Sequence, residues 1–152
     1  MSKPVTLFSK IIEGEIPCFE IARGENWLSF LDINPRRPGH TLVVPNEPVT
    51  HLAKLTSEQV SDLWLGVVKT QSYLSKYFQT SDFLVGIHDG INAGQEIPHV
   101  HVHVIPRTKG DGGKTLLACW PNTPGIGQVE PDFEALAKLQ EEIKEANNQF
   151  EE

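Results

Sequence analysis

The sequence of 152 residues has little cysteine, no cluster of basic residues and no long hydrophobic run. No apolar stretch approaches the ~20 residues that cross a bilayer, so no membrane association is expected. The two cysteines, Cys18 and Cys119, are too few and too far apart for a disulfide framework or a thiolate metal site. The N-terminal segment mixes lysine and glutamate with its apolar residues and shows no secretory signal, so we expect a cytoplasmic protein.

The net charge of −7 comes almost entirely from the C-terminal end of the chain. Residues from Glu130 onward carry eight acidic and two basic side chains, a net −6, and residues 1–129 carry twelve and eleven, a net −1. The acidity therefore does not oppose an anionic substrate elsewhere in the chain. The absence of a basic cluster argues against a nucleic acid polymer as a partner.

Hydrophobic periodicity predicts short consecutive strands with helices between them, which is typical of an α+β fold with an antiparallel meander sheet. Expected strands cover 18–23, 26–33, 40–45, 83–89 and 99–106, with a short helix near Leu7 to Ile12 and a long helix that Thr56 and Gln59 cap. We expect a single domain over 1–152. Its core covers about 5–107, a loop with five glycines and two prolines covers 108–129, and an acidic amphipathic helix covers 130–147.

The most informative stretch is "HVHVHVIPR", residues 99 to 107. Side chains alternate across a strand, so His99, His101 and His103 share one face at ~6.7 Å spacing. The valines between them point to the opposite face, toward the core. Three imidazoles on one face are hard to explain as decoration of a solvent-facing strand, although that interpretation is the simplest.

One functional interpretation is a metal site. Two imidazoles in a His-x-His pattern can bind one zinc or iron ion, with Asp89, Glu96, His88 or His40 as possible further ligands. No carboxylate lies at a recognisable ligand spacing from the histidines, and we therefore expect no metal and no cofactor.

The other functional interpretation is covalent catalysis. A neutral imidazole is a competent nucleophile near pH 7, and once phosphorylated it is also a good leaving group. The middle histidine, with a neighbour on each side, is the natural nucleophile. The preceding loop "DGINAGQEIPH" suits this chemistry, because Gly90 and Gly94 allow backbone N–H groups to approach an anion and Gln95 adds an amide donor.

These residues resemble the signature of the histidine triad family, His-φ-His-φ-His-φ-φ with φ hydrophobic. The resemblance extends through "LFSKIIEGEIP" and "FLDINPRRPGHTLVVP" to "DGINAGQEIPHVHVHVIPR". The N-terminal part is similar to histidine triad nucleotide-binding proteins. The "DGxxAGQ" loop and the closing "PR" are more similar to the fragile histidine triad branch of dinucleoside polyphosphate hydrolases. The resemblance implies a homodimer that joins two five-stranded sheets.

The resemblance also implies a nucleotide hydrolase or transferase that acts at the α-phosphate through a nucleotidyl-histidine intermediate. The implied nucleophile is His101, with His103 on the phosphate, His99 and His40 as supporting histidines, and Gln95 near the leaving group. The implied nucleotide pocket has Asp32 on the ribose hydroxyls and Phe8, Ile11, Phe30 and Ile33 around the base. Ordinary core packing explains the four apolar residues equally well, and Asp32 could instead be a turn residue before Asn34.

Two positions depart from the family pattern. Glu96 stands where many relatives have serine or threonine, and His88, which we assign to nucleotide binding, stands where they often have asparagine or glutamine. A carboxylate beside a phosphate site repels the substrate unless it is turned away or protonated. These departures support an alternative function, a nucleotide-binding regulator with little turnover.

Overall fold

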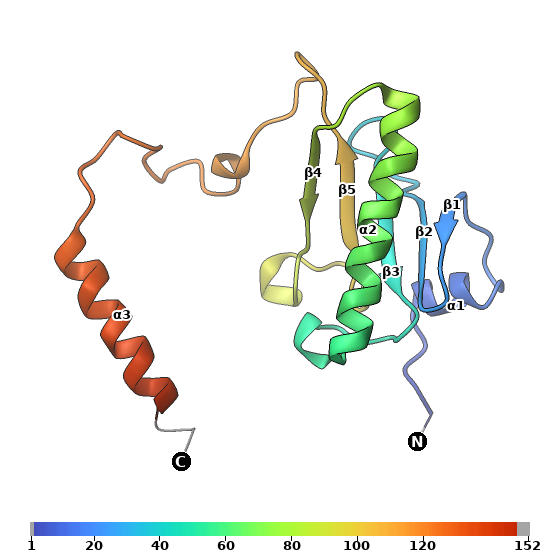
Figure 1. Cartoon of the computed structure of the whole chain (residues 1–152), viewed down its shortest axis with the longest axis horizontal. Coiled ribbons are helices and arrows are strands. Elements are labelled where there is room, and N and C mark those ends of the chain that lie inside the picture. The colour runs from blue at the N-terminus through green and yellow to red at the C-terminus, as the bar shows by residue number, and fades with distance from the viewer. Residues whose placement is uncertain (1, 149–152) are drawn as a thin grey trace. The chain divides into compact units, whose positions relative to one another are not determined.

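The structure, a computed structural model, describes residues 2–148, and its contacts divide the chain into two units, Met1–Asp111 and Gly112–Glu152. The first unit contains a five-stranded sheet in the order β1-β2-β3-β5-β4, with antiparallel pairing between all neighbours (Figure 1). Its elements are α1 (Leu7–Ile12), β1 (Glu20–Arg23), β2 (Trp27–Leu31), β3 (Thr41–Pro45), α2 (Ser57–Phe78), β4 (Phe83–Gly86) and β5 (Val102–Pro106). The predicted α+β fold with a five-stranded antiparallel sheet is confirmed.

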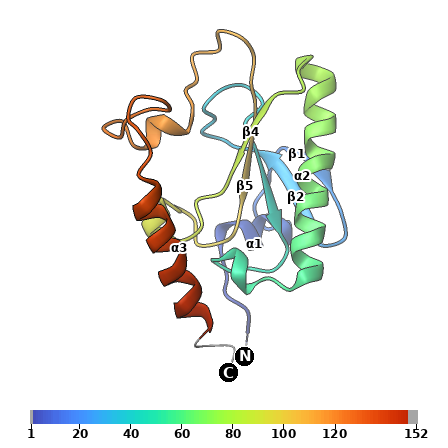
Figure 2. The ribbon, with the colours of Figure 1, turned by 60° about the vertical axis from the view of Figure 1, so that its left-hand side comes forward.

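Helix α2 covers one face of the sheet (Figure 2). It begins at the predicted capping box, in which the Thr56 side chain accepts from the Gln59 backbone and the Gln59 side chain accepts from the Thr56 backbone. Its inward side, with Leu63 and Val67, packs on the valines of β3 and β5 and on Trp27. The predicted orientation of the valines between the histidines is therefore confirmed.

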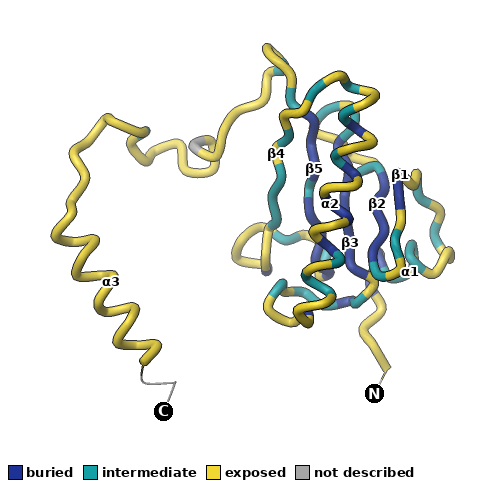
Figure 3. The backbone as a smooth tube through the Cα atoms, viewed as in Figure 1, coloured by how far each residue is buried: buried dark blue, intermediate teal, exposed yellow. Residues whose placement is uncertain are grey.

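The opposite face of the sheet carries a second apolar cluster, into which α1 inserts Phe8. The α1 helix begins at a capping box between Thr6 and Ser9. The cluster includes Leu42, which is paired with His103 in the ladder between β3 and β5, so the triad histidines lie on this second face. Both faces of β2, β3 and β5 are consequently buried (Figure 3).

All five predicted strands are wider than the observed ones, and the last two differ most at one end. The last strand begins at Val102 and not at residue 99. The Val100 N–H donates to the Val49 carbonyl, and the His99 ring donates to the Pro45 carbonyl, so these groups do not form the regular ladder. The predicted strand 83–89 ends at Gly86, before the turn that Gly90 begins. Helix α1 covers Leu7–Ile12, the residues predicted for the short N-terminal helix.

The second unit contains a 3-10 turn at Leu116–Cys119 and helix α3 (Phe133–Asn148). The acidic helix predicted for 130–147 is therefore present with slightly different ends. Its apolar stripe, Phe133, Leu136, Leu139 and Ile143, is exposed. Within the described part of the chain, no helix has both the length and the apolar composition needed to cross a membrane.

We expect Gly66→Ala to destabilise the fold, because a methyl group at this position in α2 would lie 2.5 Å from Cδ2 of Trp27. Trp27 is buried and cannot move aside freely. The helix propensity of alanine favours the change by about 1 kcal/mol, and overpacking opposes it by about 1–3 kcal/mol. Chemical denaturation should therefore give a lower free energy of unfolding for the variant.

Gly86→Ala is the matched control, since a methyl group there has no atom within 4 Å. It should leave the free energy of unfolding nearly unchanged. Equal stability of the Gly66→Ala variant and the parent would contradict the assigned packing.

Candidate active site

His99 is the structural member of the triad. Its side chain is fully buried, and its Nε2 lies 2.8 Å from the Pro45 carbonyl oxygen. A carbonyl only accepts, so Nε2 carries the proton, and Nδ1 accepts from the Thr6 hydroxyl at 2.7 Å. Both ring nitrogens are thus occupied by the protein. His99 has no nitrogen left for a substrate or a metal.

His101 has one nitrogen fixed and one available. Its Nδ1 lies 2.7 Å from the backbone carbonyl of His99, so Nδ1 carries the proton. Among the described residues nothing hydrogen-bonds to Nε2, which keeps its lone pair. The ring rests against the Phe8 ring, with centroids 5.1 Å apart in an edge arrangement. This is the tautomer and the support that a nucleophilic imidazole needs.

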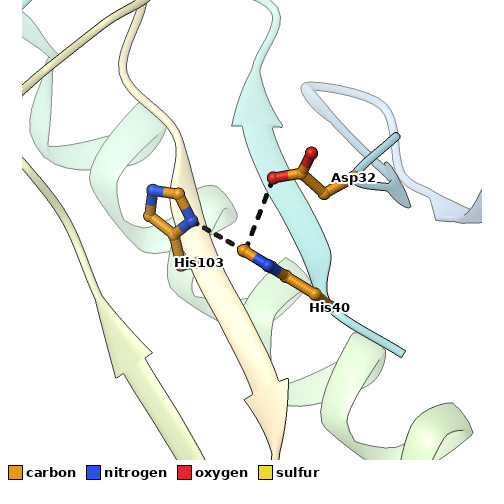
Figure 4. A group of neighbouring side chains, drawn as sticks. All are labelled: Asp32, His40 and His103. Carbon is orange, nitrogen blue, oxygen red and sulfur yellow. Dashed lines mark hydrogen bonds and ion pairs between the residues drawn. The ribbon is translucent and has the colours of Figure 1, made fainter. Parts of the chain in front are cut away.

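His103 is linked to the backbone through His40 (Figure 4). The Arg36 N–H donates to His40 Nδ1 at 3.0 Å, which leaves the His40 proton on Nε2. That Nε2 lies 2.9 Å from His103 Nδ1 and donates to it. The proton of neutral His103 is therefore on Nε2. The chain of bonds aims an N–H donor away from His40, as a group that binds phosphoryl oxygens requires.

The environment keeps all four rings neutral. Burial lowers the pKa of His99, of His101 and of His40 below the usual value of 6.5. Burial also lowers the pKa of His103 to about 4, with further contributions from the neighbouring His101 and His40. Neutral rings are consistent with the tautomers that the hydrogen bonds assign.

Asp32 joins this group from the loop after β2. Its Oδ1 accepts from the Asn34 N–H at 2.8 Å, which is a turn contact, and its Oδ2 lies 3.6 Å from His40 Nε2. The turn role considered above is therefore real, and the second oxygen still faces the histidines (Figure 4).

Asp32, His40 and His103 also place three potential metal ligand atoms within 4.8 Å of one another. A neutral histidine that binds metal through Nε2 carries its proton on Nδ1. In His40 the Nδ1 lone pair already accepts from the Arg36 N–H, so the second shell opposes metal binding. The residues present do not fit a metal ion.

The segment between β4 and the triad carries three further residues named in the sequence analysis, and a ring contact places His88 against the triad. Gln95 is half-buried, and its Nε2 donates to the Thr50 carbonyl at 2.8 Å, which leaves its second N–H available. His88 is exposed, and its ring centroid lies 5.5 Å from that of His103. Glu96 is exposed, so solvent screens its carboxylate.

The four predicted apolar residues separate into two kinds. Phe8 and Phe30 are buried in the core cluster, their ring centroids 5.6 Å apart, and Ile11 packs against that cluster half-buried. Ile33 is 77% exposed, so core packing does not explain it. Ile11 and Ile33 are therefore the two with apolar surface to offer to a ligand.

Sequence reasoning missed the groups that orient the rings. Thr6 holds His99, and the other orienting groups are backbone atoms of Arg36, Pro45 and His99. The Thr-x-x-Ser pattern at Thr6 was a detectable capping signal. No side-chain pattern reports the backbone partners.

The sheet presents one neutral imidazole with an available Nε2 beside a second imidazole with an outward N–H, an arrangement that suits a nucleophilic imidazole. The family model described as "HIT domain" matches residues 13–110, well over half of the chain. The protein belongs to the histidine triad family, as the triad residues indicated.

Three similar proteins are informative. The chain is 46% identical over 83 residues to the asymmetrical bis(5′-nucleosyl)-tetraphosphatase of Schizosaccharomyces pombe; it spans 46% of that protein's length, and the match covers 55% of the chain. It is 35% identical to the adenosine 5′-monophosphoramidase of the same yeast, with 90% of the chain and 94% of that protein covered. The crystal structure of the histidine triad nucleotide-binding protein from Candida albicans has a TM-score of 0.76 at 30% identity, covering 96% of the chain and 99% of that structure.

We expect the protein to lose stability as the pH falls from 6.5 toward 4. Three buried histidines and the half-buried His103 have lowered pKa values in the folded chain and ordinary ones in the unfolded chain, so the unfolded chain binds more protons in this window. Their stabilising contribution is complete above pH 6.5 and is lost on acidification. Each histidine protonated only on unfolding contributes a slope of about 1.4 kcal/mol per pH unit.

Urea denaturation between pH 7.5 and 5 measures this slope. The His103→Asn variant should have a shallower slope, because the ring with the largest downward shift is gone. A free energy of unfolding that stays constant between pH 6.5 and 5 would show that the rings are not held neutral.

Proposed function

We propose that this protein is a nucleotide hydrolase or nucleotidyl transferase that acts at the α-phosphate of nucleoside 5′-phosphate derivatives. The candidate substrates are dinucleoside polyphosphates and adenosine phosphoramidates. The observation that carries the proposal is the free Nε2 of His101 opposite an Nδ1 fixed by the His99 carbonyl. The two relatives from Schizosaccharomyces pombe are named as a tetraphosphatase and a monophosphoramidase, which supports this substrate class.

The reaction proceeds in two steps. The Nε2 lone pair of His101 attacks the α-phosphorus, a P–N bond forms, and the bond to the leaving group breaks with its electron pair on the leaving atom. Water then attacks the same phosphorus, the P–N bond breaks with its electron pair on Nε2, and the nucleoside monophosphate leaves. The Nε2–H of His103, held through His40, donates to the phosphoryl oxygens in both steps.

The remaining residues bind the nucleotide and the leaving group. Asp32 accepts from the ribose hydroxyls through Oδ2, and Ile11 and Ile33 offer apolar surface to the base. The free N–H of Gln95 holds the leaving group. Glu96 is exposed, so solvent weakens the repulsion between its carboxylate and a phosphate, although that carboxylate is near enough to act on the pKa of His101, in the raising direction. No cofactor is required, and a cytoplasmic location stays a prediction.

Replacing the nucleophile should abolish turnover. In the His101→Asn variant no imidazole can bond phosphorus, so hydrolysis of diadenosine polyphosphates and adenosine phosphoramidates should fall by at least about 10³-fold. Rapid mixing with labelled substrate, followed by a quench that avoids acid, should trap labelled nucleotide on the parent protein and none on the variant. The parent should keep its activity in the presence of a chelator.

Normal turnover by the His101→Asn variant would end the proposal. Tight AMP binding in calorimetry, combined with no turnover of any substrate by the parent, would support the nucleotide-binding regulator instead. Activity lost with the chelator and restored by zinc would support the metalloprotein.

We also propose that the protein is a homodimer formed through β4 and α2. Strand β4 is an edge of the sheet, with half-exposed Leu84 along it, and unpaired edge strands readily add a further strand. On α2 the neighbouring Leu65 and Val68 are each 63% exposed, three positions apart on the outer side of the helix. A second copy would cover both features.

The Leu65→Glu and Val68→Glu variants should therefore sediment as monomers under conditions in which the parent is a dimer, because a buried carboxylate opposes association. Val5→Glu is the matched control, since Val5 is an exposed apolar residue outside β4 and α2, and it should leave the dimer intact. A parent that sediments as a monomer at micromolar concentration would refute the dimer.

A further inference from the structure

His88 is an imidazole beside the triad to which the two steps above assign no role. It follows β4 by two residues, and the register that pairs Gly86 with His103 continues to place residue 88 opposite residue 101. The ring centroid of His88 lies 5.5 Å from that of His103, with the planes at 85°. The topology thus sets His88 beside the nucleophile, on the same face of the sheet.

The His88 ring has a defined orientation. Its Nδ1 lies 2.7 Å from the Ala93 carbonyl, so Nδ1 carries a proton and Nε2 is the atom available to a ligand. The turn that supplies this carbonyl is flanked by Gly90 and Gly94, both with positive φ. A methyl group at Gly94 would lie 3.2 Å from His88 Nδ1, so the loop closes against the ring.

Space for a leaving group exists beside the ring. Gly86 is on the same side of β4 as His88, and a methyl group built at Gly86 meets no atom within 4 Å. Because Gly86 has no side chain, the surface of β4 between His103 and His88 is open at that position. His88 itself is exposed, so it can exchange protons with water.

We propose that His88 is the acid and base for the leaving-group side of the reaction, an inference that rests on the function proposed above. When the bond between the α-phosphorus and the leaving atom breaks, protonated His88 gives its Nε2 proton to that atom. His88 is then neutral, with its remaining proton on Nδ1. In the second step Nε2 takes a proton from the attacking water, which completes the phosphate of the nucleoside monophosphate and restores the protonated ring.

The other groups at the site are unsuited to this role. Both nitrogens of His99 are bonded to the protein, and His101 is the nucleophile. In His103, Nδ1 accepts from His40, and the proposed reaction uses its Nε2–H as the donor to the phosphoryl oxygens. Gln95 donates a hydrogen bond but cannot transfer a proton.

A leaving-group series tests the assignment. Adenosine 5′-phosphate esters of p-nitrophenol and of phenol are compared through kcat/KM, which reports the first step. Proton donation matters little for p-nitrophenolate and greatly for phenolate, and general acid catalysis contributes about 10²–10⁴-fold. His88→Gln should therefore lose about 10²-fold on the phenyl ester and less than about 5-fold on the p-nitrophenyl ester.

His51→Gln is the matched control, since His51 is an exposed histidine whose Nδ1 bonds to Thr50, and it should change neither ester. An equal loss on both esters in His88→Gln, or no loss on either, would overturn the assignment to His88 while the proposed function stands. Failure of the parent to cleave any ester, phosphoramidate or polyphosphate would overturn both proposals together.

Discussion

The hydrogen bond from His101 Nδ1 to the carbonyl of His99 determines what the rest of the site can do. It links two residues of the same short segment, and it fixes the proton on the side of the ring that faces the protein. The opposite nitrogen then keeps its lone pair without any catalytic base beside it. The carbonyl can serve this purpose because the segment leaves the regular ladder before Val102, and His99 is itself anchored by Thr6 and Pro45.

The two faces of the sheet have different roles, one in packing and one in the environment of the histidines. The valine face, covered by α2, supplies the apolar packing that holds β3 and β5 in register. The histidine face lies over the smaller cluster around Phe8, which is apolar enough to desolvate the rings and so keeps them neutral. A strand with strict alternation is the simplest way to give one segment both environments.

The periodicity of the sequence was sufficient for the fold class and for the common face of the three histidines. The alternation at 99–104 predicted the buried valines, and the capping box at Thr56 predicted the start of α2. The tautomers could not be predicted, because they depend on backbone atoms of Arg36, Pro45 and His99 that any residue type supplies. The strand end at Val102 depends on a contact with Val49 that is distant in sequence.

The His40–His103 pair balances opposing electrostatic demands. Burial favours neutral rings in the absence of substrate, and His103 needs only its Nε2–H to bind a phosphoryl oxygen. In the proposed reaction negative charge grows on that oxygen in the transition state, so a positive charge on the pair would become favourable. Asp32, 3.6 Å from His40 Nε2, can stabilise that charge from the other side. Without substrate the pair is neutral, so the protein does not have to bury a cation. With substrate bound, the pair can take up a positive charge opposite the negative charge that develops on the phosphoryl oxygen.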